Sequence, residues 1–489
     1  MPPFEGRHFL FVIKENPKTL QPVVARIPAD LHTPLSVYLK LAAGEDHSFL
    51  LESVEGGSAL ARYSFIGTGP EMVASGRRQA VDLIRGGEAE ELQIDLIAFL
   101  REELGKYRVE PDAGLPSFTG GAIGYLGFPC SEWFEHSLAR PKGLDREFGM
   151  MMFFRSVVAF DHARQQILII TNADAGDEGS LAAAQKINSR IRERIESSEL
   201  RVPRSGTVTE SNTSVSSNFT REGFIEAVGR AKEFIAAGDC YQVVISQRFS
   251  RPTAAGPVSL YRAIRSLNPS PYMFLIKTPD RSVVGASPEM LVRVRDSEIH
   301  YRPIAGTRPR GSDEAEDRRL ADEMAADPKE VAEHQMLVDL GRNDVGRVSE
   351  YGSVRVERLM AVEKYSHVQH LVSDVTGRLR AGLDRFDALA SCFPAGTVSG
   401  APKVRAIEII RELEPDERSI YSGAVGHFDH AGNMDTCIAI RTIVLENGIA
   451  EVQAGAGIVA DSNPEAEYQE TVNKAAALLR AIEIAEKEL

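Results

Sequence analysis

The segment GAVGHFDHAGNMDTCIAIRTIVLENGIAEVQAGAGIV, residues 423–459, alternates apolar runs with short polar clusters. The clusters at His430–Asn433 and Glu446–Gly448 are typical of turns between antiparallel strands. The segment therefore predicts three neighbouring antiparallel strands, with Arg441 on the middle one. Elsewhere, strand and helix patterns come in runs and do not alternate strictly. This order favours an α+β fold with antiparallel sheets over a doubly wound parallel fold.

A polar stretch divides the chain. Residues 205–218 (SGTVTESNTSVSSN) are almost all small and polar and show no helical period, which predicts a linker. Residues 1–204 would then form a smaller, strand-rich mixed α and β portion, and residues 219–489 a larger domain.

Two helices after the linker have clear boundary signals. The first has Thr220 at its N-cap and Gly238 at its end. The second begins near Asp327, with Pro328 suited to the first turn.

Composition narrows the functional class. The 489-residue chain is 43% apolar, has a formal net charge of −14 and contains no apolar stretch of membrane-spanning length. These properties argue against a nucleic-acid-binding surface and a membrane span. The N-terminal residues lack a signal-peptide pattern, so we expect a cytoplasmic protein. The cysteines form no C-x-x-C pair and are expected to be reduced and partly buried: Cys130, Cys240, Cys392 and Cys437.

Two Glu-x-x-Glu pairs, Glu330 with Glu333 and Glu467 with Glu470, each stand near the start of a predicted helix. Residues three apart share one helix face, so each pair projects two carboxylates in one direction. If the helices face each other, the four acids form a site for a hard cation such as Mg²⁺. Solvated helix faces are the alternative.

Three further features have both structural and functional interpretations. The segment Gln453–Ile458 contains Gly455 and Gly457, whose amides in a tight turn would bind an anion; a plain turn is the alternative. Phe393–Lys403 precedes a helix and is either an anion cradle or a structural loop. Arg441 either pairs with a buried acid or binds a carboxylate, and His370 is either structural or an acid–base group.

These segments, in this order, resemble the chorismate-utilising enzymes, which include anthranilate, aminodeoxychorismate and isochorismate synthases. The resemblance is dense across Phe219–Leu479 and is carried by PIAGTRPRG, DPKEVAEHQMLVDLGRNDVGRV, HVQHLVSDV, CFPAGTVSGAPKVRAIEII, YSGAVGHF, DTCIAIRT and QAGAGIVADSNPEAEYQETVNKA. It implies a large antiparallel β-sandwich with flanking helices. A smaller N-terminal regulatory portion would pack on a chorismate-binding catalytic domain.

The resemblance also implies residue roles. Glu333 and Glu470 match direct Mg²⁺ ligands, and Glu330 and Glu467 match acids that reach the metal through water. His370 matches a catalytic histidine near the leaving hydroxyl, and Thr397 matches a catalytic position in a polar wall of the pocket. The matched chorismate-binding residues are Tyr421, Arg441, Gly455, Gly457 and Lys474.

Two positions distinguish the branches of the family. Gln242 stands where isochorismate synthases carry a lysine that activates water, and glutamine cannot act as a base near neutral pH. Ala305 stands where aminodeoxychorismate synthases commonly carry a nucleophilic lysine. The resemblance therefore points to the branch that makes anthranilate and pyruvate from chorismate and ammonia, as a lyase of tryptophan biosynthesis.

The resemblance extends to regulation and partners. Ser53, Pro271, Tyr272 and Met273 match a tryptophan feedback site, whose alternative is a strand edge and a turn. No segment resembles a glutaminase, so a separate glutamine amidotransferase subunit is expected to supply ammonia within a hetero-oligomer. The remaining alternatives are an aminodeoxyisochorismate or aminodeoxychorismate synthase component, and an inactive subunit that binds tryptophan or chorismate.

Overall fold

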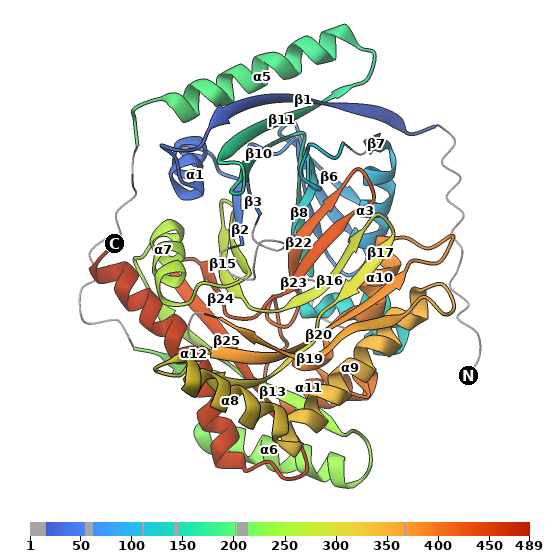
Figure 1. Ribbon diagram of the computed structural model, residues 1–489, viewed down its shortest axis with the longest axis vertical. Coiled ribbons are helices and arrows are strands. Elements are labelled where there is room, and N and C mark those ends of the chain that lie inside the picture. Colours follow the sequence, from blue (N-terminus) through green and yellow to red (C-terminus); the bar gives the residue numbers. More distant parts are fainter. Residues whose placement is uncertain are drawn as a thin grey trace.

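The computed structural model describes residues 16–53, 62–109, 112–140, 146–200, 202, 214–365 and 368–489. Two large sheets pack face to face, and helices cover their outer sides (Figure 1). The α5 helix lies across β1 and β11 at one end of the molecule, whereas α6, α11 and α12 gather at the other. The predicted α+β class, with an antiparallel sandwich and flanking helices, is confirmed.

The first sheet pairs its strands antiparallel except where β1 meets β7. In spatial order its strands are β12 (Ser216–Ser217), β13 (Gln242–Pro252), β25 (Ile449–Ile458), β24 (Thr442–Glu446), β15 (Arg281–Ser287), β14 (Tyr272–Lys277), β2 (Ser48–Glu52), β3 (Tyr63–Thr68), β10 (Ser156–Asp161), β11 (Gln166–Asp174), β1 (Lys18–Pro28) and β7 (Tyr107–Val109), with β21 (Gly400–Ala401) also on β13.

The second sheet is antiparallel throughout the described pairs. Its order is β18 (Ile304–Pro309), β20 (Val368–Arg378), β17 (Glu298–Tyr301), β16 (Met290–Arg295), β23 (Met434–Ile438), β22 (Ala424–Asp429), β8 (Gly121–Leu126), β9 (Gly149–Phe154), β4 (Met72–Gly76), β5 (Val81–Arg85) and β6 (Glu88–Leu92), with β19 (Arg355–Lys364) also on β20.

The helices begin and end where local signals allow. Thr220 caps α6, as predicted, and α9 starts next to Asp327 with Pro328 in its first turn, as predicted; Gly238 adopts a φ of 84° after α6. The α-helices are α1 (Pro34–Ala42), α3 (Leu96–Gly105), α4 (Ser131–Phe134), α5 (Glu178–Glu196), α6 (Arg221–Ala236), α7 (Pro257–Leu267), α8 (Glu314–Ala326), α9 (Pro328–Val348), α10 (Arg385–Cys392), α11 (Lys403–Leu413) and α12 (Pro464–Lys487).

Residues 1–204 and residues 219–489 each contribute strands to both sheets. Strand β2 of the N-terminal segment pairs with β14, and β8 pairs with β22. Residues 205–213 of the predicted linker lie outside the described residues, and Ser216–Ser217 pair with β13. The division into two domains at residues 205–218 therefore stays a prediction, and both sheets contain strands from each side of it.

The core between the sheets is rich in large apolar side chains. Phe49, Phe154 and Phe274 pack there. The rings of Phe49 and Phe154 pack edge to face, with their centroids 4.9 Å apart. The four cysteines are buried and free, as expected. Among the described helices, none is both long and apolar enough to cross a membrane.

Replacement of Leu50 by alanine should lower the free energy of unfolding by about 2–5 kcal/mol, because a buried cavity would remain. Leu50 is fully buried on β2, where it pairs with Leu275 of β14 and Ile66 of β3. Urea unfolding measures the change. The matched control is Leu31→Ala, at a leucine that is 86% exposed. Equal losses of unfolding free energy in both variants would contradict the burial of Leu50.

Candidate active site

The site lies where two paired chain segments pass from one sheet into the other. Strands β15 and β24 pair in the first sheet, and their continuations β16 and β23 pair in the second. Glu289 lies at one crossing and Arg441 at the other. The Ile438 amide donates to the Glu289 carbonyl at 3.0 Å, and the Ala286 amide donates to the Arg441 carbonyl at 3.1 Å. These bonds hold the two crossings together.

The expected middle strand is therefore two strands. Arg441 lies between β23 and β24 with a φ of 51°, so the prediction that it sits on a continuous strand is wrong. A chain that leaves one sheet and enters another must break its ladder, and Arg441 lies at that break. The predicted turns at His430–Asn433 and Glu446–Gly448 are confirmed.

Arg441 and Lys474 bring positive charge to the crossing. The Arg441 Nη1 donates to the Lys474 carbonyl at 3.0 Å. Lys474 Nζ lies 2.6 Å from Glu470 Oε1 and donates to the Gly455 carbonyl at 3.1 Å. Burial lowers the pKa of Arg441, while Tyr421 and Glu470 act in the opposite direction. Both cations thus lie beside β25, the strand that carries the glycines.

Gly455 and Gly457 lie within β25, so the prediction of a tight turn is wrong. Their register partners on β13 are Ser246 and Val244, which donate their amides away from β25, to Glu414 and to Ser399. In an antiparallel pair, opposed residues turn their amides either toward each other or both away. The amides of Gly455 and Gly457 therefore face the side of β25 where Lys474 lies.

Close approach of side chains explains both glycines. A Cβ at position 455 would lie 2.8 Å from Tyr421 Oη, and one at position 457 would lie 2.6 Å from Gln242 Nε2. Burial raises the pKa of Tyr421, so its hydroxyl is protonated at neutral pH. Gln242 and Tyr421 thus border the same part of β25.

His370 of β20 lies on the β18 side of the site. Its Nδ1 lies 2.8 Å from the Gly306 carbonyl and 3.1 Å from Thr307 Oγ1. A bond to a carbonyl requires a proton on Nδ1, which leaves Nε2 as the basic nitrogen of the neutral ring. Burial and the charge of Arg441 lower the pKa of His370, although the bond to Gly306 raises it. Ala305 precedes this contact on β18.

Glu289 is a site residue that the sequence reasoning missed. Thr397 Oγ1 donates to its Oε1 at 2.9 Å. Burial raises the pKa of Glu289 to about 8, against the opposing effects of Thr397 and Lys474. The carboxyl is therefore mainly protonated at neutral pH and is able to donate a proton. The sequence feature that could have identified Glu289 is its place directly after a proline, between the apolar strand segments SVVGAS and MLVRV.

The four predicted metal-binding acids lie near the N-terminal ends of α9 and α12: Glu330, Glu333, Glu467 and Glu470. Lys329 Nζ lies 3.9 Å from Asp461 Oδ2, which joins these ends of the two helices. Burial and the charges of Glu330 and Glu470 raise the pKa of Glu333. Burial and the charge of Glu470 raise the pKa of Glu467. The acids therefore share one electrostatic environment.

Basic side chains engage two of these acids. Arg308 Nη1 donates to Glu330 at 2.8 Å, and Lys474 pairs with Glu470. In the described ranges, no three acids, histidines or cysteines are gathered closely enough to hold a metal ion. The donor set fits a hard divalent cation, because carboxylate oxygens are its preferred ligands and their mutual repulsion would be relieved. A cation there would compete with Arg308 and Lys474 for these two carboxylates.

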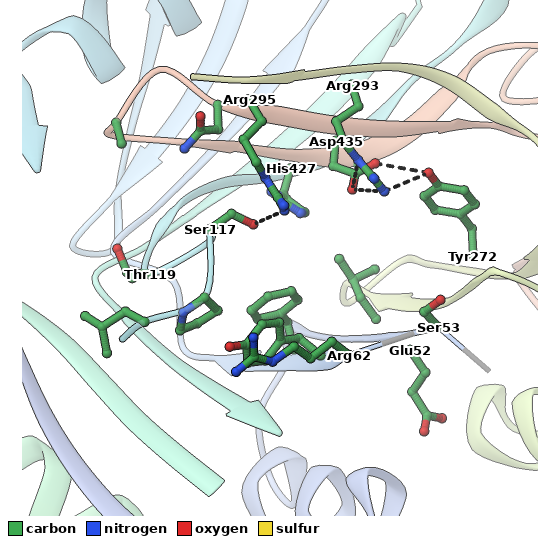
Figure 2. Close-up of a pocket in the computed structure, with 18 of the residues that line it drawn as sticks. Glu52, Ser53, Arg62, Ser117, Thr119, Tyr272, Arg293, Arg295, His427 and Asp435 are labelled. Atoms are coloured by element: carbon green, nitrogen blue, oxygen red, sulfur yellow. Dashed lines mark hydrogen bonds and ion pairs between the residues drawn. The ribbon is translucent and has the colours of Figure 1, made fainter. Parts of the chain in front are cut away.

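A separate cavity of about 690 Å³ lies between the sheets, and all four residues of the predicted feedback site line it: Ser53, Pro271, Tyr272 and Met273. Figure 2 shows Tyr272, Arg293 and Asp435 joined on one side, with Ser53 and Arg62 across from them. Arg293 Nη2 lies 2.7 Å from Asp435 Oδ2, and Tyr272 donates to Asp435 at 3.2 Å. The buried Ser53 hydroxyl has no hydrogen-bond partner among the described residues.

Several known proteins are similar to this chain in sequence or in fold. Residues 46–480 match the family described as chorismate binding enzyme. Anthranilate synthase component 1 of Pseudomonas aeruginosa is 48% identical over 468 residues, which cover 94% of this chain and 94% of that protein. The crystal structure of anthranilate synthase component I from Streptococcus pneumoniae is 35% identical, with a TM-score of 0.74 over 93% of this chain and 99% of that one. A menaquinone-specific isochorismate synthase from Escherichia coli, 20% identical with a TM-score of 0.69 over 96% of each chain, shares the fold.

The raised pKa of Glu289 should make stability fall with pH. Between about 4.5, the ordinary value, and about 8, the folded state binds a proton that the unfolded state has released. The free energy of unfolding of the wild type should therefore fall relative to that of Glu289→Gln by roughly 1.4 kcal/mol per pH unit in this window. Urea unfolding at several pH values measures the difference. The exposed Glu90→Gln variant is the control, and a pH-independent difference for Glu289→Gln would contradict the protonated carboxyl.

Proposed function

Because the chain belongs to the chorismate binding enzyme family, we propose that it is the large component of an anthranilate synthase. It converts chorismate and ammonia to anthranilate and pyruvate. The observation that carries the proposal is the crossing of the two sheets. There Arg441, Lys474 and the amides of Gly455 and Gly457 provide charge and donors for a substrate with two carboxylates.

Protonation states support the roles of two side chains. Ammonia forms a bond to C2 of chorismate as the C4–O bond breaks. The oxygen leaves as water with the proton of Glu289, and the new ammonium group releases one proton to solvent. The protonated carboxyl of Glu289 and its bond to Thr397 support this step. His370 takes up the C2 proton through Nε2, since its Nδ1 proton is committed to Gly306. The C3–O bond of the enolpyruvyl group then breaks, and the departing enolate takes up a proton to become pyruvate.

Two residues support ammonia as the nucleophile. Gln242 is buried on β13 beside Gly457 and offers an amide, which is not a base that could activate water. Ala305 of β18 has no nucleophilic atom, so no covalent intermediate forms there. The acids Glu333 and Glu470 would hold Mg²⁺ directly, and Glu330 and Glu467 through water. When bound, the ion neutralises the ring carboxylate and favours loss of the C4 oxygen.

The proposal includes a partner and a location. The name of the relatives, component 1, supports a second component, and a glutamine amidotransferase subunit would supply the ammonia in a hetero-oligomer. The four buried free thiols accord with a reducing cytoplasm. Tryptophan binds in the cavity between the sheets and inhibits the enzyme. There the Ser53 hydroxyl, which has no partner in the part of the chain that the structure describes, offers it a polar contact.

The direct test uses the purified chain with chorismate, Mg²⁺ and an ammonium salt. Anthranilate fluorescence and equimolar pyruvate are expected without any partner subunit. Amination without release of pyruvate would contradict the proposed product and indicate an aminodeoxyisochorismate or aminodeoxychorismate synthase. The absence of chorismate turnover would overturn the proposal as a whole.

Substitution of Glu333 or Glu470 by glutamine should lower kcat/KM by about 100-fold or more, because each would remove a metal-binding charge. The same variants should need more Mg²⁺ for half-maximal activity and should bind it more weakly in calorimetry. The control is Asp339→Asn, an exposed acid on α9 that pairs with Arg342. Unchanged Mg²⁺ dependence in both glutamine variants would show that the metal binds elsewhere.

Ser53→Phe should relieve inhibition by tryptophan while activity without tryptophan remains, because the phenyl ring would occupy part of the cavity. Inhibition curves for wild type and variant measure this effect. The exposed serine of α5 provides the control Ser189→Phe, which should stay sensitive. If the Ser53→Phe enzyme were as sensitive to tryptophan as the wild type, tryptophan would not bind in this cavity.

A further inference from the structure

Arg418 is a buried arginine behind the candidate active site, and its side chain is fully shielded from solvent. All five N–H groups of its guanidinium have acceptors. The Nε donates to Glu414 at 3.0 Å, and Nη2 donates to Glu414 at 2.6 Å and to the Val244 carbonyl at 2.8 Å. The Nη1 donates to the Val398 carbonyl at 2.7 Å and to Ser422 Oγ at 3.0 Å.

Glu414, the partner of Arg418, also holds strand β13. It follows the last turn of α11, and its Oε1 accepts from both the amide and the hydroxyl of Ser246 at 2.8 Å. The Ser246 hydroxyl in turn accepts from Gln453 Nε2 at 2.9 Å. Both ends of the ion pair therefore bind β13, at Val244 and at Ser246.

The hydrogen-bond partners of the Arg418–Glu414 pair belong to three separate segments, each next to residues of the proposed chorismate site. Val398 follows Thr397, and Ser422 follows Tyr421. Val244 and Ser246 are the register partners of Gly457 and Gly455. The guanidinium also faces the ring of Tyr421, with its central carbon 5.4 Å from the ring centroid.

We infer that the Arg418–Glu414 pair positions the chorismate-binding surface by holding the Thr397 turn, Tyr421 and the β13–β25 pair in one geometry. The pair itself does not touch the substrate. This inference rests on the proposed function, because it concerns residues that bind chorismate. Two apolar residues of similar volume could fill the same space, often without loss of stability. They could not hold three backbone segments in place.

The physical reason is the shape of the guanidinium. Its donors lie in one plane and in fixed directions, so they set the relative positions of the acceptors. Lysine keeps the positive charge but has three donors around a single nitrogen, and it cannot reach Val398, Ser422, Val244 and Glu414 together. Arg418→Lys therefore keeps the positive charge and removes the contacts that set the positions of the acceptors.

The test compares Arg418→Lys with Arg251→Lys. Arg251 lies on β13 and, like Arg418, is buried and paired with an acid: its Nη2 donates to Glu486 at 2.6 Å. Arg418→Lys should raise both KM and the calorimetric Kd for chorismate roughly 10–100-fold, with a smaller change in kcat. Arg251→Lys should leave KM at the wild-type value, even if it lowers the melting temperature as much.

Single hydrogen-bond deletions keep the inference testable if Arg418→Lys does not fold. Ser246→Ala and Ser422→Ala each remove one contact of the pair and should raise KM about two- to tenfold. The control on the same strand is Ser250→Ala, whose hydroxyl bonds to Glu451.

The outcomes separate the two proposals. A wild-type enzyme that makes no anthranilate overturns the proposed function. An active wild type whose Arg418→Lys variant keeps the wild-type KM and Kd overturns the positioning role, as do unchanged values in both serine variants if Arg418→Lys does not fold. A rise in KM with Arg251→Lys as large as with Arg418→Lys would mean that general destabilisation explains the effect, and this too overturns it.

Discussion

The architecture depends on one pair of chain segments that stay antiparallel while they change sheets. Residues 281–295 and 434–446 form the β15–β24 ladder in the first sheet and the β16–β23 ladder in the second. Backbone bonds from Ala286 to Arg441 and from Ile438 to Glu289 hold the crossing. Since neither segment can cross alone without losing its partner, the two breaks must coincide in space. This coincidence places Glu289 and Arg441 in one site.

The same crossing separates the cavity between the sheets from the candidate active site. On the inner side, β16 and β23 contribute Arg293, Asp435 and Cys437 to the cavity between the sheets. Where these strands meet the crossing, the chain places Glu289 and Arg441 in the candidate active site. The cavity and the site therefore share two strands but none of the residues to which a role is assigned. A ligand in the cavity would contact β16 and β23, the two strands that lead to Glu289 and Arg441 of the candidate active site.

Local features of the fold were predictable from the sequence, and long-range ones were not. The Thr220 cap, the start of α9 near Asp327 and the turn at Glu446–Gly448 depend on neighbouring residues, and they are confirmed. The change of sheet before Arg441 depends on strands far away in the chain, and the segment itself shows only continuous apolar character. Glu289 was missed for the same reason, since its burial and its bond to Thr397 arise only in the folded protein. The roles assigned to Glu333, Glu470 and Lys474 came from resemblance and remain predictions.

Backbone conformation shows why the site resists local prediction. Arg441 and Ser422 both adopt positive φ angles, 51° and 65°, which cost free energy for residues other than glycine. Such conformations persist only where surrounding contacts determine them. The Arg441 carbonyl is held by Ala286, and Ser422 is held by Arg418 through its hydroxyl and by the Ala439 carbonyl through its amide. Hydrogen bonds from other parts of the chain therefore hold these two residues in conformations that their own sequence disfavours.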